Sequence, residues 1–460
     1  MRTPYRKNHG KITFVLYNKP HSCKGNCLFC FKSEGFTKST TPNEDTLLAK
    51  NTSWNGKKQL EARFKNYSLK KDSGIKCDFA LKGDSFASHS EEYLRNYTKE
   101  LYDFLNGTKS STLKEAADLQ KISKDKCVTF KIETRPDQID IKKCLFFMEL
   151  GITTVEIGVQ SLDDNVLKYN HRGHTTKEVI HATKLLRQFG FEVVYQMMVG
   201  LPGSNREIEK KMYTKTLWDE QYSPDAIKVY PCLLLKKQYA NHEKLRNLYS
   251  KGLWTPINYE DYISFLFEIS SYIPRYVHIN RIQRIISEEK IEAGIKQLID
   301  RKIFSSSINC LWQRSVANKL SKVDICYPDC KIIHYSQGKN RYCFEVIFQN
   351  DVVLGYARFD LTENNNSIIR DIRVLGNMLL VGEKNRNKNC QHKGIGSALL
   401  KAIETYALQE KINCIYLKPS FGTSNWFLNR GFSYVNDFYL VKHLTKDEKQ
   451  NITPTNILHL

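Results

Sequence analysis

The sequence lacks any long hydrophobic run. Its 460 residues contain no stretch of about 18 consecutive apolar side chains, the length that a membrane-spanning helix requires. The opening residues are basic, but the apolar run after them is short and no small-residue cleavage site follows, so we expect no signal peptide. Internal repeats and low-complexity tracts are also absent. We therefore expect a cytoplasmic protein that does not enter a membrane.

Acidic residues are scarce relative to basic ones. The chain has 49 Asp and Glu against 70 Lys and Arg, a net charge of +21. This excess indicates a nucleic-acid partner, and a general lysine bias with solvated faces is the alternative. Residues 50–71 concentrate the charge and interleave Trp54, Phe64 and Tyr67 with basic residues. Cations neutralise phosphates and rings stack on bases, so this segment is predicted to bind a single-stranded loop of RNA.

The 13 cysteines indicate a reducing compartment, and most of them, such as Cys144, are expected to be small buried side chains. Cys23, Cys27 and Cys30 differ because they share one short stretch, KPHSCKGNCLFC. Three thiols this close cannot all pair with one another, and no second CxxC follows to complete a zinc ribbon. An iron–sulfur cluster with three cysteine ligands and one open iron fits better. Zinc, with His21 as the fourth ligand, is the alternative.

Apolar strand-like runs alternate with helical patterns from about residue 75 to residue 235. This alternation predicts right-handed crossovers and a parallel sheet, open or closed into a barrel. Polar residues end two of the predicted strands, Glu133 and Arg135 in one case and Glu156 and Gln160 in the other. Because the strand ends form the active face of such barrels, we expect a ligand site there. A surface ion pair between Glu133 and Arg135 is the alternative.

After residue 331 the pattern changes to antiparallel-like strands, followed by QHKGIG and a long amphipathic helix. Glycines at this place let the backbone turn tightly onto the helix N-terminus, where free N–H groups bind pyrophosphate. With Gln391, the stretch Gly394, Ile395 and Gly396 resembles the acetyl-CoA loop of the GNAT acetyltransferases. A plain glycine turn is the alternative.

The motifs KPHSCKGNCLFC, KIETRPD, MMVGLPGS, INRIQR, IRDIRVLG, QHKGIG and FGTSNWFLNRGF occur in an order that resembles the catalytic subunit of Elongator. That resemblance implies an α/β protein with a partial TIM-type radical-SAM barrel and a GNAT domain. We assign the radical-SAM domain to residues 1–305, a cysteine-containing linker to 306–330 and the GNAT domain to 331–460.

The resemblance also implies a chemistry. Cys23, Cys27 and Cys30 would hold a 4Fe–4S cluster that binds S-adenosylmethionine and yields a 5′-deoxyadenosyl radical. The radical would take hydrogen from the methyl of acetyl-CoA, and the carbon radical would add to C5 of the wobble uridine in a tRNA. Thioester hydrolysis would leave 5-carboxymethyluridine, which makes the protein a tRNA carboxymethyluridine synthase. A reductant protein, accessory subunits and a homodimer are candidate partners beside tRNA and acetyl-CoA.

Individual residues follow from the same resemblance. Gly83 matches a loop at the methionine end of S-adenosylmethionine, and Glu133, Arg135, Glu156 and Gln160 form the catalytic face. The residues that would contact acetyl-CoA are Lys76, Asp371, Ile372, Arg373, Val374, Gln391, Gly394, Ile395, Gly396 and Trp426.

The chain departs from the family pattern in several places. Asp84 replaces the second glycine of a Gly-Gly pair, and Phe31 replaces a proline after the cysteines. Trp426 and Phe427 replace two tyrosines near the acyl group, so both hydroxyls are missing, and Tyr416 and Tyr434 become candidate acids. The family has linker cysteines that can bind zinc. This chain keeps them only in part, as Cys310, Cys326 and Cys330, and has no obvious fourth ligand.

Two other functions fit parts of the sequence. One is a lysine or small-molecule N-acetyltransferase in which the GNAT domain acts alone, and the missing tyrosine hydroxyls argue against it. The other is a tRNA-binding protein with inactive chemistry. The intact cysteines and the intact glycine loop argue against that reading.

Overall fold

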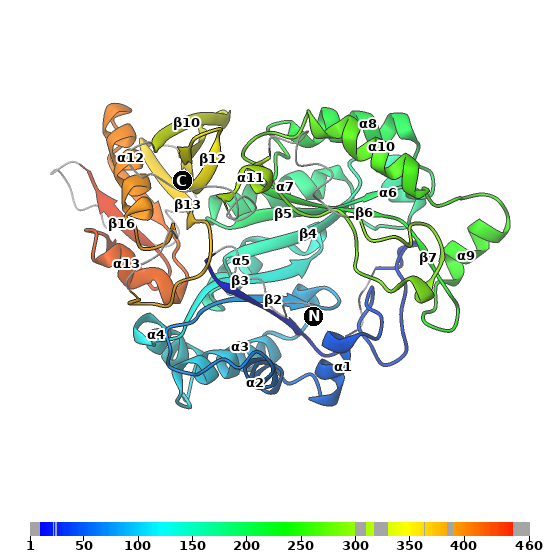
Figure 1. Cartoon of the computed structure of the whole chain (residues 1–460), viewed down its shortest axis with the longest axis horizontal. Helices are drawn as coiled ribbons and strands as arrows, with labels where there is room; N and C mark the ends of the chain where they lie inside the picture. Colours follow the sequence, from blue (N-terminus) through cyan, green and yellow to red (C-terminus); the bar gives the residue numbers. More distant parts are fainter. Residues whose placement is uncertain are drawn as a thin grey trace.

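The computed structural model describes residues 10–21, 23, 25–299, 310–316, 330–362, 364–383 and 390–444. Its first half is built on a curled sheet of seven parallel strands, which runs through the centre of Figure 1. The strands lie in the order β1 (Ile12–Tyr17), β2 (Lys76–Lys82), β3 (Lys126–Thr134), β4 (Thr154–Gln160), β5 (Glu192–Val199), β6 (Ala226–Pro231) and β8 (His278–Arg281). The predicted half-barrel is therefore confirmed, and the sheet also recruits β1 and β8 from outside residues 75–235.

Helices connect these strands and cover the convex face of the sheet (Figure 1). They are α1 (Glu44–Asn51), α2 (Gly56–Asn66), α3 (Glu91–Asn106), α4 (Leu113–Ile122), α5 (Ile141–Glu149), α6 (Asp164–Tyr169), α7 (Thr176–Gln188), α8 (Arg206–Thr214), α9 (Glu243–Ser250) and α10 (Tyr259–Ser270). A two-stranded sheet, β7 (Leu234–Leu235) with β9 (Ile291–Ala293), lies beside the barrel. No helix in the described ranges is long and apolar enough to cross a membrane.

The strands alternate between an apolar and a polar face because successive side chains point to opposite sides of a sheet. In β1, Ile12, Phe14 and Leu16 are buried on the helix side, where Phe14 stacks on Phe64 of α2 with ring centroids 5.2 Å apart. The alternate residues of β1 to β6 face the concave interior, and many of them are charged. The fold thus places its apolar core between sheet and helices and leaves a polar interior.

The second half contains a mixed seven-stranded sheet that begins after the short helix α11 (Leu311–Arg314). Its order is β10 (Lys331–Gly338), β11 (Arg341–Phe348), β12 (Val352–Leu361), β13 (Asn366–Val374), β14 (Cys414–Leu417), β16 (Leu440–His443) and β15 (Ser433–Tyr434). The helices are α12 (Ile395–Gln409) and α13 (Ser424–Leu428). Parallel pairing of β13 with β14 stops at Ile369 and Leu417, although β13 continues to Val374. The end of β13 is therefore free to face a ligand.

The two halves are joined by buried ion pairs. Arg358 of β12 is fully buried, and it donates hydrogen bonds to the backbone carbonyl oxygens of Asp225 (3.0 Å) and Tyr276 (3.3 Å) in the first half. Arg370 of β13 contacts the Asp225 carboxylate at 2.6 Å. Burial opposes ionisation of Asp225, but Arg370 and Arg358 hold the pKa of its carboxyl well below the usual range. The domain interface thus contains buried ion pairs beside apolar contacts, such as that between the Tyr102 and Phe421 rings.

The basic segment 50–71 forms the end of α1, the whole of α2 and the turn that follows. Phe64 is only 4% exposed and packs on Phe14, so the prediction that it stacks on RNA bases is wrong. Arg63 is buried against Asp45 at 2.9 Å. Helix amphipathicity explains both, since one face of α2 must cover β1. The exposed cations of this segment are Lys50, Lys57, Lys58, Lys65, Lys70 and Lys71.

The predicted linker cysteines lie only partly within the described residues. Cys326 lies outside the described residues, as do 306–309 and 317–329. Cys310 is buried and Cys330 is half-buried. Within the described ranges, no group of three His, Cys, Asp or Glu side chains is gathered around a point that could hold a metal ion.

Candidate active sites

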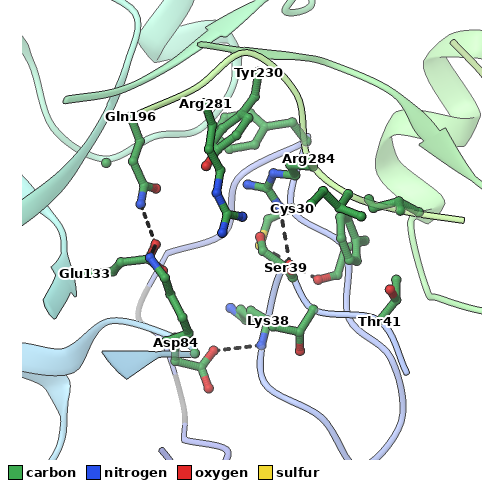
Figure 2. A pocket seen from close by; sticks show the side chains of 18 of the residues that line it. Cys30, Lys38, Ser39, Thr41, Asp84, Glu133, Gln196, Tyr230, Arg281 and Arg284 are labelled. Atoms are coloured by element: carbon green, nitrogen blue, oxygen red, sulfur yellow. Dashed lines mark hydrogen bonds and ion pairs between the residues drawn. The ribbon is translucent and has the colours of Figure 1, made fainter. Parts of the chain in front are cut away.

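A cavity of about 830 Å³ lies at the carboxyl ends of the parallel strands, and we call it the upper cavity. Strands β1 to β6 and β8 all contribute to its lining, as do the loops that carry the three cysteines. Figure 2 shows Gln196, Arg281 and Tyr230 in the upper part of the view, Arg284 beside Cys30 and Ser39, and Lys38 and Asp84 below them. Among the predicted residues, those that line it are Cys23, Cys27, Cys30, Gly83, Glu133, Arg135 and Gln160.

The three cysteines enter the upper cavity in a cationic setting. Arg172 donates to the Cys27 sulfur at 3.5 Å, and the Gly25 N–H donates to the Cys23 sulfur at 3.3 Å. The Lys38 ammonium holds the loop through the carbonyl oxygens of Cys23 (3.2 Å) and Gly25 (2.9 Å). Burial raises the pKa of the Cys30 thiol, whose sulfur lies 3.3 Å from the Ser39 hydroxyl.

This donor set fits a 4Fe–4S cluster. The three cysteines line one cavity, and N–H donors with cations lie beside them, as an anionic cluster requires. Their sulfurs do not meet around a single point, but a cluster presents a separate iron to each thiolate, whereas one metal ion would need them to converge. His21, the fourth ligand in the zinc alternative, does not line the cavity. Its ring lies against His89, with centroids 4.8 Å apart. The geometry therefore favours three ligands from the protein over four.

Asp84 ties down the cysteine loop. One carboxylate oxygen accepts the His21 N–H at 3.0 Å and the other accepts the Lys38 N–H at 2.9 Å. Gly83 before it has φ +99°, and a β-carbon there would lie 2.8 Å from Thr37 Cγ2. Residue 83 therefore has to be glycine. Asp84, which departs from the family pattern, binds the backbone on both sides of the three cysteines, at His21 and at Lys38.

Below the cysteines lies a cluster of acids and lysines. Glu133 and Glu156 share Lys82, Lys228 and Gln196, with Gln196 donating to Glu133 at 2.7 Å and Lys82 to Glu156 at 2.8 Å. Burial opposes ionisation of Glu156, but Lys228 and Lys82 hold its pKa well below the usual range. Burial lowers the pKa of Lys228 to about 7. Glu133 lines the cavity, while Glu156 lies beneath it.

Arg135 and Gln160 have other partners. Arg135 pairs with Asp137 at 2.8 Å and donates to the Arg172 carbonyl oxygen at 2.8 Å. The ion pair with Glu133 that was the alternative reading is therefore not formed. Gln160 lines the cavity at the end of β4 with φ +73°, an uncommon conformation for a residue with a side chain.

Sequence reasoning missed part of this site. The missed lining and supporting residues are Lys82, Arg172, Gln196, Lys228, Tyr230, Arg281 and Arg284. Lys82 is the last residue of β2, so the rule that drew attention to Glu133 applies to it too, whereas Gln196 and Lys228 lie inside β5 and β6, where no strand-end signal marks them.

A second cavity of about 790 Å³ lies between the two domains, and we call it the cleft. One wall is the free end of β13, the glycine loop and α13. The other is the amino-terminal side of the half-barrel sheet. All ten predicted acetyl-CoA residues line the cleft, namely Lys76, Asp371, Ile372, Arg373, Val374, Gln391, Gly394, Ile395, Gly396 and Trp426.

Lys76 reaches the cleft from the first domain. Its ammonium donates to the Gln391 side-chain oxygen at 3.0 Å and lies 3.1 Å from His392 Nε2. Burial lowers the pKa of Lys76 to about 8. Gly394 has φ +84° and precedes α12, and a β-carbon there would meet no atom within 4 Å. A cation, an open glycine turn and a helix N-terminus together fit a pyrophosphate.

The acyl end of the cleft lacks a tyrosine hydroxyl. Trp426 and Phe427 both line it, with the Arg430 guanidinium 3.8 Å from the Trp426 ring centre. Neither Tyr416, which is buried in β14, nor Tyr434, which is exposed on β15, lines the cleft. The prediction of these two tyrosines as candidate acids thus gains no support from their positions.

Two buried lysines line the cleft instead. Burial lowers the pKa of both Lys11 and Lys418 to about 7. Lys11 donates to the Thr129 hydroxyl and lies 3.5 Å from Asp78, and Lys418 donates to the Ile152 carbonyl oxygen at 2.7 Å. Each can hold or release a proton near neutral pH.

Comparison with known proteins agrees with this arrangement. Residues 17–213 match the radical SAM superfamily, residues 224–309 its C-terminal domain, and residues 312–432 the GNAT acetyltransferase family. The chain is therefore a radical SAM protein with a C-terminal GNAT domain. Members of these families use a 4Fe–4S cluster with S-adenosylmethionine and acetyl-CoA, respectively, and the donor sets described above fit those groups.

Full-length relatives narrow the family. The chain is 27% identical to the tRNA uridine(34) acetyltransferase of Dehalococcoides mccartyi, with 96% of this chain and 100% of that protein covered. It is 26% identical to Elongator complex protein 3 of Homo sapiens, with 96% and 85% covered. The solved structure of Methanocaldococcus infernus Elp3 has the same fold, with a TM-score of 0.80 at 24% identity over 95% of this chain. Over 96% of its length the chain is thus similar to tRNA uridine(34) acetyltransferases and to Elongator complex protein 3.

Proposed function

We propose that this protein modifies the wobble uridine of tRNA and attaches a carboxymethyl group to C5, with acetyl-CoA as the carbon source. One observation carries the proposal: a single chain holds a cavity lined by three cysteines and a cleft lined by a glycine loop and Lys76, at the two ends of the same seven-stranded sheet. Relatives covered over nearly their full length are named tRNA uridine(34) acetyltransferases, which supports tRNA as the substrate.

In the upper cavity, Cys23, Cys27 and Cys30 would hold the cluster, which with S-adenosylmethionine supplies an agent that can abstract a hydrogen atom from a methyl group. Arg172 and Lys38 offset the negative charge of the thiolates. Glu133 and Gln196 would offer hydrogen-bonding groups to a ligand that enters the upper cavity, and they hold each other in place.

In the cleft, Lys76 and the glycine loop would bind the CoA phosphates, and the free end of β13 would pair with the pantetheine amides. Trp426 and Phe427 line the cleft and would pack against the arm. Lys11 and Lys418 would hold the protons that thioester hydrolysis needs, because each ammonium loses its proton near neutral pH.

The test is isotopic. The protein, reconstituted anaerobically, is incubated with unmodified tRNA, dithionite, S-adenosylmethionine and acetyl-CoA labelled with ¹³C in both acetyl carbons, and the nucleosides are then measured by mass spectrometry. We expect 5-carboxymethyluridine that carries both heavy carbons, and none with the Cys27→Ala protein. Heavy acetyl on protein lysines or on a polyamine, with unmodified uridine, would instead support the acetyltransferase alternative.

A further inference from the structure

Only a short length of strand separates the upper cavity from the cleft. On three strands, a residue that lines the cleft and a residue that lines the upper cavity are four positions apart and share the inward face. The pairs are Lys11 with Val15 at β1, Thr129 with Glu133 on β3, and Glu192 with Gln196 on β5. Four residues of strand span about 13 Å. One inward-facing layer of side chains therefore lies between the two cavities.

That layer is polar. The Asp78 carboxylate accepts hydrogen bonds from Thr13 at 2.7 Å and from Lys131 at 2.8 Å, and Val194 adds an apolar side chain from β5. None of these four residues lines either cavity. Asp78 is almost fully buried, but 22% of the Lys131 side chain is exposed and Thr13 is half-buried. The layer is thus a narrow polar constriction in which some side chains stay partly exposed, rather than a fully packed plug.

Such a layer is unusual on energetic grounds. The interior of a closed barrel of this kind is normally filled by branched apolar residues. Buried ion pairs seldom stabilise a protein more than apolar residues of the same size would. Here the layer itself carries Lys131 against Asp78, and Lys11 of the cleft lies 3.5 Å from the same carboxylate. Stability alone does not explain this composition, whereas a passage for a polar group does.

The proposed function needs a passage. The methyl of the thioester must meet the chemistry of the upper cavity, yet the CoA cleft opens at the opposite ends of the same strands. We propose that the acyl end of the CoA arm passes from the cleft through the half-barrel, between Thr13, Asp78 and Lys131, into the upper cavity. This inference rests on the proposed function. Lys131 is the movable side of the constriction, since Asp78 keeps Thr13 and Lys11 as partners when Lys131 turns away.

A ladder of cysteines on β3 measures how far the acyl end reaches. Thr129→Cys, Lys131→Cys and Glu133→Cys place one thiol at the cleft, the constriction and the upper cavity. Bromoacetyl-CoA alkylates a thiol that its acyl carbon can reach: the sulfur–carbon bond forms, the carbon–bromine bond breaks, bromide leaves and the thiol proton passes to buffer. Peptide mass spectrometry locates the label among the native cysteines. The protein is used without cluster or tRNA, so the result is independent of the isotopic test.

We expect labelling at residues 129, 131 and 133, slower with each step inward, and suppressed at all three by excess desulfo-CoA. Free bromoacetamide reports which thiols are accessible from solvent. Desulfo-CoA should not prevent bromoacetamide from labelling residue 133. Ile122→Cys, on the exposed side of α4 (73% exposed), is the matched control that both reagents label whether or not desulfo-CoA is present. Thr13→Cys probes the same layer without breaking the Asp78–Lys131 pair, in case Lys131→Cys does not fold.

The proposal is overturned if bromoacetyl-CoA labels residue 129 alone while bromoacetamide labels residues 13, 131 and 133, because the cleft is then closed at its inner end. It is equally overturned if bromoacetyl-CoA labels none of the ladder, since its acyl end then does not face the barrel. In either case, heavy carboxymethyluridine from the wild-type protein would leave the proposed function standing and require another route for the acyl group.

Discussion

The upper cavity and the cleft have nearly the same volume, about 830 and 790 Å³, but they are built differently. The upper cavity belongs to one domain, and its polar groups are already paired in the cluster of Glu133, Glu156, Lys82 and Lys228. The cleft needs both domains: the Lys76 ammonium of one reaches Gln391 of the other. The first site therefore depends on the strands and loops of one domain, whereas the second depends on how the domains dock.

The comparison predicts that a substitution can abolish the function of one site and leave the other intact. The largest such effect is expected at Cys27. We expect Cys27→Ala to abolish iron binding and the broad visible absorption after anaerobic reconstitution, because two thiolates cannot replace three. Acetyl-CoA affinity, measured by calorimetry, should not change. Cys144→Ala, at a fully buried cysteine of α5 outside both cavities, is the control that keeps the iron. Stoichiometric zinc without iron in the wild-type protein would contradict the cluster assignment.

The next largest effect concerns the missing hydroxyls of the cleft. A tyrosine hydroxyl that protonates the leaving thiolate contributes about a hundredfold in rate. Restoring it with the double variant Trp426→Tyr, Phe427→Tyr should raise tRNA-dependent thiol release by about that factor while acetyl-CoA affinity stays the same. Equal rates in wild type and variant would place the acid elsewhere, and Lys11 and Lys418 would be the first candidates. A wild-type protein that binds no acetyl-CoA would contradict the function assigned to the cleft.

A smaller effect should separate the two sites by pH. Burial lowers the pKa of Lys76 to about 8, so its ammonium is present below pH 8 and is lost as the pH rises through that value. Acetyl-CoA affinity should therefore fall between pH 7 and 9, by about tenfold if one charge-assisted hydrogen bond is lost. Lys76→Met should bind weakly at both pH values and show a flatter profile. Lys57→Met, on the exposed face of α2, should keep the wild-type profile, and an unchanged profile in Lys76→Met would show that another group controls binding.

The smallest effect belongs to the surface. Lys57 and Lys58 are exposed on α2, and Lys57 has only a loose pairing with Glu61 at 3.9 Å. If both contact tRNA phosphates, Lys57→Glu with Lys58→Glu should weaken tRNA binding and reduce the slope of log affinity against log salt by about two units. Lys401→Glu, on the exposed face of α12, is the control. An unchanged slope would place the tRNA on another surface.

The sequence allowed the strand alternation to be predicted because each strand and helix carries its own period. It also identified Glu133 and Gln160, which follow recognisable strand ends. It did not identify Lys228, because a lysine inside the apolar run AIKVYP has no visible partner: its partner Glu156 lies 72 residues away. The Lys76–Gln391 contact joins residues 315 positions apart, and it was not predicted: the family resemblance implied only that each of the two residues contacts acetyl-CoA.

Phe64 shows the opposite error. Its neighbours are basic, which suggested an RNA surface, but helical spacing places it on the face of α2 that covers β1. Charge along the sequence does not say which side of a helix a residue occupies. Amphipathic spacing would have been the better guide in this segment.

The buried pairing of Arg358 and Arg370 with Asp225 limits how the two domains can be exchanged in evolution. Arg358 and Arg370 pair with Asp371 and Asp360 of their own domain, and they also bind the Asp225 carbonyl oxygen and carboxylate in the other domain. A GNAT domain without these two arginines would leave the buried Asp225 carboxylate with only Arg187 of its own domain to offset its charge, and breaking a buried ion pair costs about 3–5 kcal/mol. Recombination between distant genes is therefore penalised at this junction. The two halves are constrained to be inherited, and to accumulate changes, as one unit.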